Sequence, residues 1–279
     1  MSISPGLYVV ATPIGNLGDI TLRAIDVLKS ADLVLCEDTR VAGKLFAAHG
    51  IDTAKRSYHD HNAERARPEI IARLKDGAAI ALVSDAGTPL ISDPGYKLVR
   101  EARAEGLAVH AVPGPSALTA ALSVAGLPTD RVLFAGFPPQ KAAARSAFFD
   151  SFAATPASLV FYETGPRLAA SLTAMADAFG DRDAAVVREL TKTYEEARLG
   201  RLSMLARQCA QKPPKGEIVV IVARADADAA PAADLDALVS HALETQSVKD
   251  AAAAVAAETG FPKKTVYARA LALKNKAAP

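Results

Sequence analysis

Several features are scarce or missing in this sequence of 279 residues, and each absence excludes a class of protein. No apolar run reaches the roughly 18 residues that a membrane-spanning helix needs, so we expect a soluble protein with no membrane partner. The N-terminal segment Met1–Pro5 does not combine a basic stretch with an apolar one, so a secretory signal is not expected. Together these absences favour a cytoplasmic protein.

The sequence has two cysteines, Cys36 and Cys209, which lie far apart and lack the spacing of metal ligands. Cys36 ends an apolar run and is expected to be a reduced thiol in a core. His59 and His61 flank Asp60, but this segment has no cysteine and no further clear ligand, so zinc is not expected. The sequence therefore predicts no metal site.

Two common catalytic motifs are also missing. There is no G-x-S-x-G elbow and no Walker loop, which argues against serine hydrolysis and P-loop phosphoryl transfer. The loop Thr12–Asp19 resembles a dinucleotide-binding fingerprint, but it has two of the three glycines, and Pro13 interrupts the turn. The acidic residue of that fingerprint would have to be Glu37 or Asp38, so nicotinamide binding is a weak alternative. Asp19 is expected to be the N-cap of the next helix.

Charge is nearly balanced over the whole chain, at a net +1, but it is uneven. From Val248 to the C-terminus there are six basic and two acidic residues, a net charge of +4. A polyanionic partner explains such a basic segment, and a solvated helix face explains it almost as well.

Apolar runs alternate with helical patterns over the first 115 residues. Strands are predicted at Leu7–Ala11, Leu33–Cys36, Ala79–Val83 and Ala108–Val112. Helices are predicted between them, at Ile20–Lys29, Val41–His49, Glu64–Lys75 and Gly95–Glu105. This alternation predicts a mostly parallel sheet covered by helices on both faces.

A second α/β domain is predicted over residues 116–225, hinged near residues 113–128. After a helix at Ser116–Ala125, its predicted strands are Val132–Ala135, Ser158–Tyr162, Ala184–Arg188 and Ile218–Ala223. Its further helices are predicted at Ala142–Phe152, Pro166–Phe179 and Leu199–Gln211.

The C-terminal part is predicted to be separate and helical. An acidic, Ala- and Pro-rich stretch over residues 225–234 is interpreted as a linker. In the basic tail, residues 234–279, helices at Lys249–Glu258 and Lys263–Lys274 flank a glycine-containing turn, which gives helix-turn-helix proportions. An ordinary helical hairpin has the same pattern, so both interpretations stay open.

Two polar loops follow predicted strands in the first domain. Ser84–Gly95 follows the strand Ala79–Val83, and Pro113–Ala117 follows the strand Ala108–Val112; both are rich in Gly and Pro. Glycine lets a backbone approach a ligand closely, and open α/β sheets bind ligands at the carboxyl ends of their strands. We therefore expect the two loops to form opposite walls of one crevice.

A third polar segment, Glu37–Arg40, follows the strand Leu33–Cys36. Its acidic residues are candidates for acid–base chemistry, but an internal ion pair with Arg40 explains them equally well. The cluster Tyr58–Asn62 offers histidine and asparagine donors for phosphate or sugar groups.

Seven segments carry a resemblance to a known family: Leu7–Thr21, Glu37–Arg40, Tyr58–Asn62, Ser84–Gly95, Pro113–Ser116, Phe161–Glu163 and Gly216–Val219. In this order they resemble the tetrapyrrole-methylase superfamily, and more narrowly its branch that modifies ribosomal RNA. The similarity covers nearly the whole chain, and Ser84–Gly95 is close to diagnostic of that branch. One departure is Thr164-Gly165-Pro166, where the family pattern has Ser-Pro-His; it leaves open what this loop contacts.

The resemblance implies a methyltransferase that uses S-adenosylmethionine, releases S-adenosylhomocysteine and forms a homodimer. It implies two α/β domains with the cofactor in the cleft between them. The cofactor contacts that it implies are Ile14, Asp85, Thr88, Ser116, Ala117, Tyr162 and Glu217. The substrate that it implies is the ribose 2′-oxygen of cytidine 1402 in 16S ribosomal RNA, so the small ribosomal subunit is the expected partner.

Methyl transfer from a sulfonium is an in-line displacement that needs no metal, so the protein must align donor and acceptor and can supply a base. The candidate bases near the expected cleft are Glu37, Asp38, His59 and Asp19. The residues expected to contact RNA are Arg40, His61, Lys263, Lys264 and Arg269.

Two other functions stay open at this level. The same fold can act on a corrin-type tetrapyrrole or a diphthamide precursor, although the basic tail and the Tyr58–Asn62 cluster argue against such acceptors. A non-catalytic nucleic-acid binder would leave the ligand-type loops of the first 220 or so residues without a role.

Overall fold

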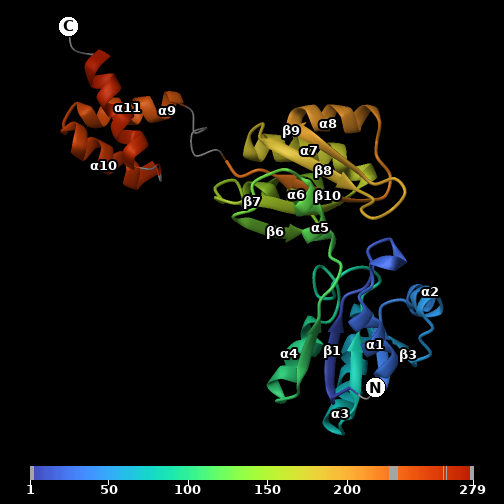
Figure 1. Cartoon of the computed structure of the whole chain (residues 1–279). Coiled ribbons are helices and arrows are strands. Elements are labelled where there is room, and N and C mark those ends of the chain that lie inside the picture. The colour runs from blue at the N-terminus through green and yellow to red at the C-terminus, as the bar shows by residue number, and fades with distance from the viewer. Residues whose placement is uncertain (1–2, 226–231, 260, 262, 277–279) are drawn as a thin grey trace. The chain divides into compact units, whose positions relative to one another are not determined.

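The computed structural model describes residues 3–225, 232–259, 261 and 263–276. It divides into two compact units, Met1–Ala223 and Arg224–Pro279 (Figure 1). Most of the predicted linker lies outside the described residues, and a helix already begins at Ala232, so the interpretation of residues 232–234 as linker is wrong. Among the described residues, none of the helices combines the length and the apolar character that crossing a membrane requires.

The first sheet of the larger unit is entirely parallel and has the strand order β3-β2-β4-β1-β5. Its strands are β1 (Gly6–Val10), β2 (Leu33–Cys36), β3 (Lys55–Ser57), β4 (Ala79–Leu82) and β5 (Val109–Val112). Its helices are α1 (Leu22–Ser30), α2 (Thr39–His49), α3 (Asp60–Lys75) and α4 (Tyr96–Ala104), with a 3-10 turn, η1, at Leu17–Asp19. The predicted parallel sheet is confirmed.

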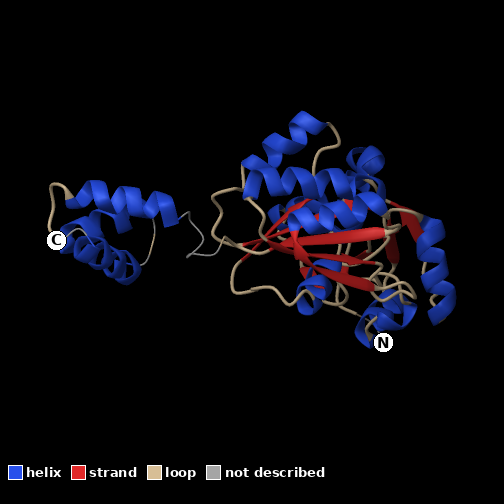
Figure 2. Cartoon of the chain, turned by 90° about the horizontal axis from the view of Figure 1, so that it is seen from above, coloured by secondary structure: helices blue, strands red, loops and turns tan. Residues whose placement is uncertain are grey.

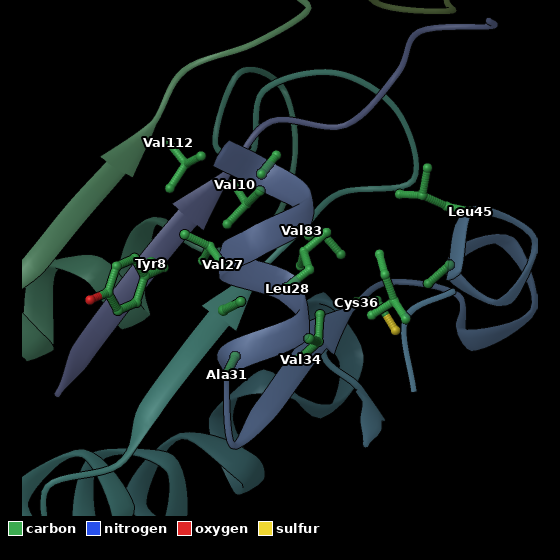
Figure 3. Packing of buried hydrophobic residues seen from close by; sticks show 14 of the residues in the cluster. Tyr8, Val10, Val27, Leu28, Ala31, Val34, Cys36, Leu45, Val83 and Val112 are labelled. Carbon is green, nitrogen blue, oxygen red and sulfur yellow. The ribbon is translucent and has the colours of Figure 1, made fainter. Parts of the chain in front are cut away.

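Both faces of this sheet are buried, which is why its central strands are continuous apolar runs. On one face, Val27 and Leu28 of α1 belong to a cluster with Val10, Val34 and Val83 (Figure 3). On the other face, residues such as Leu7 and Ile80 join a cluster with Ile70 of α3 and Leu98 of α4. Cys36 is a buried free thiol, as expected, and burial raises its pKa to about 11.

Three local predictions for this region need correction. The polar edge strand β3 was not predicted, because its Lys-Arg-Ser sequence has no apolar side chain to signal a sheet. Helix α3 begins at Asp60, so His61 and Asn62 lie in a first helical turn rather than in a loop. The N-cap of α1 is Thr21, whose hydroxyl accepts from the Ala24 N–H at 3.1 Å; Asp19 lies in η1 instead.

The second sheet has the order β6-β7-β10-β8-β9, and only its β6–β7 pair is parallel. Its strands are β6 (Val132–Gly136), β7 (Ser158–Thr164), β8 (Asp183–Arg188), β9 (Glu196–Arg201) and β10 (Glu217–Val222). Its helices are α5 (Ala117–Val124), α6 (Ala142–Asp150), α7 (Gly165–Phe179) and α8 (Leu202–Gln211). The helix predicted from Leu199 begins at Leu202, because residues 199–201 complete the unpredicted edge strand β9.

The two faces of the second sheet pack against different elements. One face packs against α6, α7 and α8 through residues such as Leu168 and Leu205. On the other face, Val160 and Val219 share a cluster with Ala121 of α5 and with Ile14. Because Ile14 follows β1, the loop after the first strand of the chain packs against the second sheet.

The C-terminal unit contains the helices α9 (Ala232–Leu243), α10 (Val248–Thr259) and α11 (Lys263–Lys276). Figure 2 shows these helices in blue, and the strands, in red, in the larger unit. Apolar residues from each helix, among them Val239, Val255 and Val266, form a small core. Ser247 caps α10 by accepting the Asp250 N–H at 3.2 Å. The two helices predicted for the basic tail are confirmed.

Candidate functional site

The candidate site lies at the carboxyl ends of β4, β1 and β5, which are neighbours in the first sheet. The Thr12 and Gly87 backbones exchange hydrogen bonds of 2.9 and 3.1 Å, which join the loops after β1 and β4. The Thr88 hydroxyl donates to the Pro115 carbonyl at 3.0 Å and joins the loop after β4 to the loop after β5. The three loops are therefore tied to one another by their own hydrogen bonds.

A cavity of about 310 Å³, here called the first cavity, is lined by these loops and by the second sheet. Ile14, Val187, Leu190 and Val219 give it an apolar wall. Its lining contains all seven residues predicted to contact the cofactor, namely Ile14, Asp85, Thr88, Ser116, Ala117, Tyr162 and Glu217. The structure thus brings these seven residues together, and their binding role stays a prediction.

A second cavity, of about 520 Å³, shares Asp85 with the first. The other residues of its lining are Glu37, Asp38, Thr39, Arg40, Ser57, His59, Asp60, His61 and Pro94. Three of the four candidate bases, Glu37, Asp38 and His59, and both RNA contacts predicted from the first domain therefore line one cavity, whereas Asp19 is not among its lining residues. The Asp38 N–H donates to Oδ1 of Asp85 at 3.0 Å and links this group to the loop after β4.

Asp38 has structural tasks that argue against the predicted role as a base. Its carboxylate caps α2 by accepting the Arg40 N–H at 2.8 Å, and it pairs with the Arg40 guanidinium at 2.6 Å. These hydrogen bonds lower the pKa of Asp38 to about 2. So acidic a carboxylate is a poor proton acceptor at neutral pH, and the alternative of an internal ion pair applies to Asp38.

Glu37 and His59 differ from Asp38. Burial, and next the negative charge of Asp85, raise the pKa of Glu37. His59 is the N-cap of α3, and its backbone N–H donates to Oδ1 of Asn62 at 2.9 Å. Its Nδ1 atom is buried and has no hydrogen-bond partner among the described residues. Glu37 therefore keeps proton-binding capacity beside the second cavity, and His59 lines the same cavity.

The lining of the first cavity also contains residues that the sequence did not single out. One is Asp93, the second aspartate of the Ser84–Gly95 segment. Burial, and after it the negative charge of Glu37, raises the pKa of Asp93 to about 6. Another is Phe137, which is 53% exposed and packs edge-on to the Tyr162 ring, with the two ring centroids 5.4 Å apart. Burial raises the pKa of Tyr162. The two aspartates of the Ser84–Gly95 segment were the available signal for Asp93.

A buried carboxylate, that of Glu163, lies at the far wall of the first cavity. It accepts hydrogen bonds from the Ser171 hydroxyl and the Thr164 N–H and lies 3.3 Å from the Arg167 guanidinium. Because its oxygens are occupied by these donors, Glu163 holds β7 and α7 together next to the cavity.

Glu217 contributes a different kind of contact. Its carboxylate pairs with Lys192 at 3.0 Å, and Lys192 also pairs with Glu189 at 3.1 Å. The aliphatic stem of Lys192 lies over Gly15, where an added Cβ would be 2.5 Å from the lysine Cγ. Lys192 therefore connects Glu217 with the loop after β1.

The departure Thr164-Gly165-Pro166 has a steric explanation. A Cβ at Gly165 would overlap the carbonyl oxygen of Pro214, so a residue with a side chain does not fit there. Pro166 lies in the first turn of α7, where proline is well tolerated. This loop contacts the segment that precedes β10.

The predicted RNA contacts in the C-terminal unit fall into two groups. Lys263 and Lys264 are exposed at the start of α11. Arg269 instead pairs with the carboxylate of Asp236 through two nitrogens, at 2.5 and 2.6 Å. The exposed lysines remain candidates for RNA contact, whereas Arg269 has an intramolecular partner. Over the described part of the chain, no cluster of three or more His, Cys, Asp or Glu side chains is suited to hold a metal ion.

Comparison with known proteins places this architecture in a family. The profile of "Tetrapyrrole (Corrin/Porphyrin) Methylases" matches residues 6–206. The chain belongs to this family. The profile of the "RsmI C-terminal HTH domain" matches residues 229–274, which decides between the helix-turn-helix and the plain hairpin. A nicotinamide-binding fold is not supported.

Two curated relatives are similar over almost their whole length. The ribosomal RNA small subunit methyltransferase I of Mesorhizobium japonicum is 50% identical, over 98% of this chain and 94% of the relative. The protein of the same name from Erythrobacter litoralis is 51% identical, over 98% of this chain and 97% of the relative.

Solved structures with lower identity share the fold. The uroporphyrin-III C-methyltransferase of Thermus thermophilus has a TM-score of 0.56 and 23% identity, covering 78% of this chain and 94% of that protein. A diphthine synthase has a TM-score of 0.57 and 17% identity, covering 78% of this chain and 89% of that protein. At these identities the likeness concerns the fold alone.

Proposed function

We propose that this protein methylates ribosomal RNA of the small subunit, with S-adenosylmethionine as the donor and the ribose 2′-oxygen of cytidine 1402 in 16S rRNA as the acceptor. The observation that carries the proposal is the arrangement of two cavities around one carboxylate, Asp85, in a methylase fold whose relatives at about 50% identity are named for this RNA.

The first cavity suits the donor. S-adenosylmethionine supplies an electrophilic methyl group on a sulfonium and carries an adenosine and an amino-acid part. The apolar wall of Ile14, Leu190 and Val219 fits a purine face, and the polar groups of Asp85 and Thr88 fit its hydroxyls and amines. A volume of about 310 Å³ lies within the range of small-molecule pockets, at its lower end.

The second cavity suits a nucleotide of RNA. Arg40 lines the cavity with a side chain that is 87% exposed although it pairs with Asp38, and His61 adds a hydrogen-bonding ring. Such groups bind phosphate and sugar, whereas the neighbouring carboxyl groups accept hydrogen bonds from hydroxyls. We assign the ribose end to Glu37 and His59 and the phosphate end to Arg40 and His61.

The residues of this chain contribute mainly alignment. The hydrogen bonds between the loops after β1, β4 and β5 fix the walls of the first cavity before any ligand binds. Fixing two reactants in an in-line geometry can supply about 7–11 kcal/mol of the barrier reduction. The C-terminal unit, through Lys263 and Lys264, adds affinity for RNA.

The proposal is tested on RNA from cells. Ribose methylation of small-subunit rRNA is mapped by mass spectrometry in a deletion strain and in the same strain carrying the gene. We expect one 2′-O-methylcytidine, at position 1402, to disappear and return. In parallel, the purified protein is offered naked 16S rRNA, small subunits and a tetrapyrrole acceptor with labelled donor. Methylation of the tetrapyrrole alone, or an unchanged rRNA map, contradicts the proposal.

Two accompanying expectations belong to the same proposal. We propose that the protein acts in the cytoplasm, where small subunits are assembled, and that it acts as a homodimer. Light scattering at the concentration of the assay measures the mass of the protein in solution. A monomer mass together with full activity rejects the homodimer.

A further inference from the structure

Asp93 occupies a junction that the assigned roles do not explain. Asp93 lines the first cavity, whereas the next residue, Pro94, lines the second. Asp85 lines both cavities. Asp93 and Asp85 therefore stand where the space assigned to the donor meets the space assigned to the acceptor.

The backbone is held in an uncommon conformation to place Asp93 there. Leu90 and Ser92 have φ values of +72° and +66°, a left-handed conformation that residues other than glycine rarely adopt. At Gly95 (φ +126°) an added Cβ would lie 2.7 Å from Leu82. The segment thus turns back onto the end of β4 and directs Asp93 to the cavity. Such conformations are strained and persist where the surrounding structure imposes them.

The groups around Asp93 come from three elements. Glu37 after β2 and Asp85 after β4 face it with negative charge, Ser84 hydrogen-bonds to it, and Tyr162 of β7 lies within its electrostatic reach. Burial and the Glu37 charge outweigh the Ser84 hydrogen bond, and its pKa of about 6 lies near the pH of the cell. A carboxylate with such a pKa is mostly ionised at pH 7 and still binds a proton well.

We propose that Asp93 is the general base of the methyl transfer and accepts the proton of the acceptor hydroxyl. This inference rests on the proposed function. The acceptor oxygen forms its bond to the methyl carbon, the carbon–sulfur bond breaks, and its electron pair stays on the sulfur of the sulfonium donor. The hydroxyl proton passes to an Asp93 carboxylate oxygen. The sulfonium charge and the carboxylate charge are both neutralised in this step.

The test compares Asp93→Asn with the unchanged full-length protein and with Asp26→Asn, a change on the exposed side of α1. Single-turnover rates are measured from pH 5 to pH 8.5 on small-subunit RNA. For the parent and Asp26→Asn, we expect the single-turnover rate to rise with pH and to level off above an apparent pKa near 6. We expect Asp93→Asn to be slower by roughly 10²- to 10⁴-fold and to lack this pH-dependent limb.

Three readouts separate a base from a structural residue. Calorimetry with S-adenosylmethionine and RNA binding should give affinities within about twofold of the parent, because the proton transfer contributes in the transition state rather than in the bound ground state. Carboxyl ¹³C NMR, with the Asp93 signal assigned by its absence in Asp93→Asn, should show titration near pH 6. A signal that titrates near pH 4 contradicts the inference.

The outcomes distinguish this inference from the proposed function. An Asp93→Asn variant that stays within a few-fold of the parent, or that keeps the pH-dependent limb, overturns the inference alone. If Glu37→Gln removes that limb and Asp93→Asn keeps it, the base is Glu37. A parent protein that methylates no small-subunit RNA rejects the proposed function, and the assignment of Asp93 fails with it.

Discussion

The backbone N–H of Asp38 donates a 3.0 Å hydrogen bond to Oδ1 of Asp85, which is the carboxylate that both cavities share. The bond connects the end of β2 with the loop after β4, and so it couples the acceptor side of the site to the donor side. It also fixes the orientation of Asp85, because one of its oxygens already has a partner inside the protein. Asp85 therefore combines a structural contact with its proposed contact to the donor.

Substitutions of Asp85 should separate these two tasks. Asp85→Asn keeps an oxygen for the Asp38 N–H and removes the charge, whereas Asp85→Ala removes both. A charge-assisted hydrogen bond to a ligand contributes about 1.5–3 kcal/mol, so we expect S-adenosylmethionine to bind Asp85→Ala about 10- to 150-fold more weakly. Titration calorimetry measures this change. Unchanged affinity in Asp85→Ala would exclude Asp85 from the donor site.

Asp38 should behave as a structural residue. Asparagine caps helices about as well as aspartate, and the ion pair with Arg40 that it loses is exposed. Asp38→Asn should therefore lower the melting temperature only slightly and keep the single-turnover rate close to the parent value. Asp38→Ala loses the cap of α2 and should melt at a lower temperature. Thermal unfolding and single-turnover rates on both variants test this prediction. A rate loss of 100-fold or more in a stable Asp38→Asn variant would instead restore Asp38 as a catalytic group.

The raised pKa of Asp93 should appear in the stability of the protein. The folded state holds the Asp93 proton up to about pH 6, whereas an unfolded aspartate releases it near pH 4. Between these values the folded state binds more protons, so the Asp93 contribution to stability falls as pH rises through this window. Asp93→Asn should therefore gain melting temperature relative to the parent at pH 7.5 and lose this advantage near pH 4. An equal difference in melting temperature between Asp93→Asn and the parent at pH 7.5 and at pH 4 contradicts the raised pKa of Asp93.

Gly165 and Gly43 form a matched pair of glycine-to-alanine changes. At Gly165 an added Cβ overlaps the Pro214 carbonyl oxygen, whereas nothing lies within 4 Å of a Cβ at Gly43, inside α2. Overpacking costs about 1–3 kcal/mol, so Gly165→Ala should lower the melting temperature by several degrees. Gly43→Ala should stabilise by about 0.4–1 kcal/mol. Chemical denaturation of both variants measures the difference, and a neutral Gly165→Ala variant would show that the α7 start can shift.

The two groups of cations in the C-terminal unit should respond differently to salt. Replacing Lys263 and Lys264 by serine removes two exposed cations, and each phosphate contact contributes roughly 0.7–0.9 to the slope of log K against log salt. We expect the slope for RNA binding to fall by up to about 1.4–1.8. Arg269→Ala should change the slope less, because Asp236 already pairs with the arginine. Fluorescence anisotropy from 50 to 300 mM KCl measures both slopes, and equal slopes for the lysine variant and the parent reject phosphate contact.

Much of the molecule follows from the sequence. Strands such as β1 and β4 are buried on both faces, and a short apolar run between helical patterns is sufficient to identify them. The Gly- and Pro-rich loops after β4 and β5 were identifiable because glycine, proline and polar side chains interrupt the apolar pattern at a strand end. Seven of the residues that line the first cavity were predicted through the family resemblance, which depends on those same loops.

What the sequence did not determine depends on contacts between distant residues. The edge strands β3 and β9 carry few buried side chains, so hydrogen bonds to their neighbours, rather than an apolar pattern, define them. The choice between a catalytic and a structural Asp38 required the positions of Arg40 and Asp85 around it. The proton affinity of Asp93 likewise depends on burial and on Glu37, which is more than fifty residues away in the chain. Short sequence patterns determined the buried strands, the helices and the loops between them. The tertiary fold determined the proton affinity of individual carboxyl groups, because that affinity depends on neighbours from distant parts of the chain.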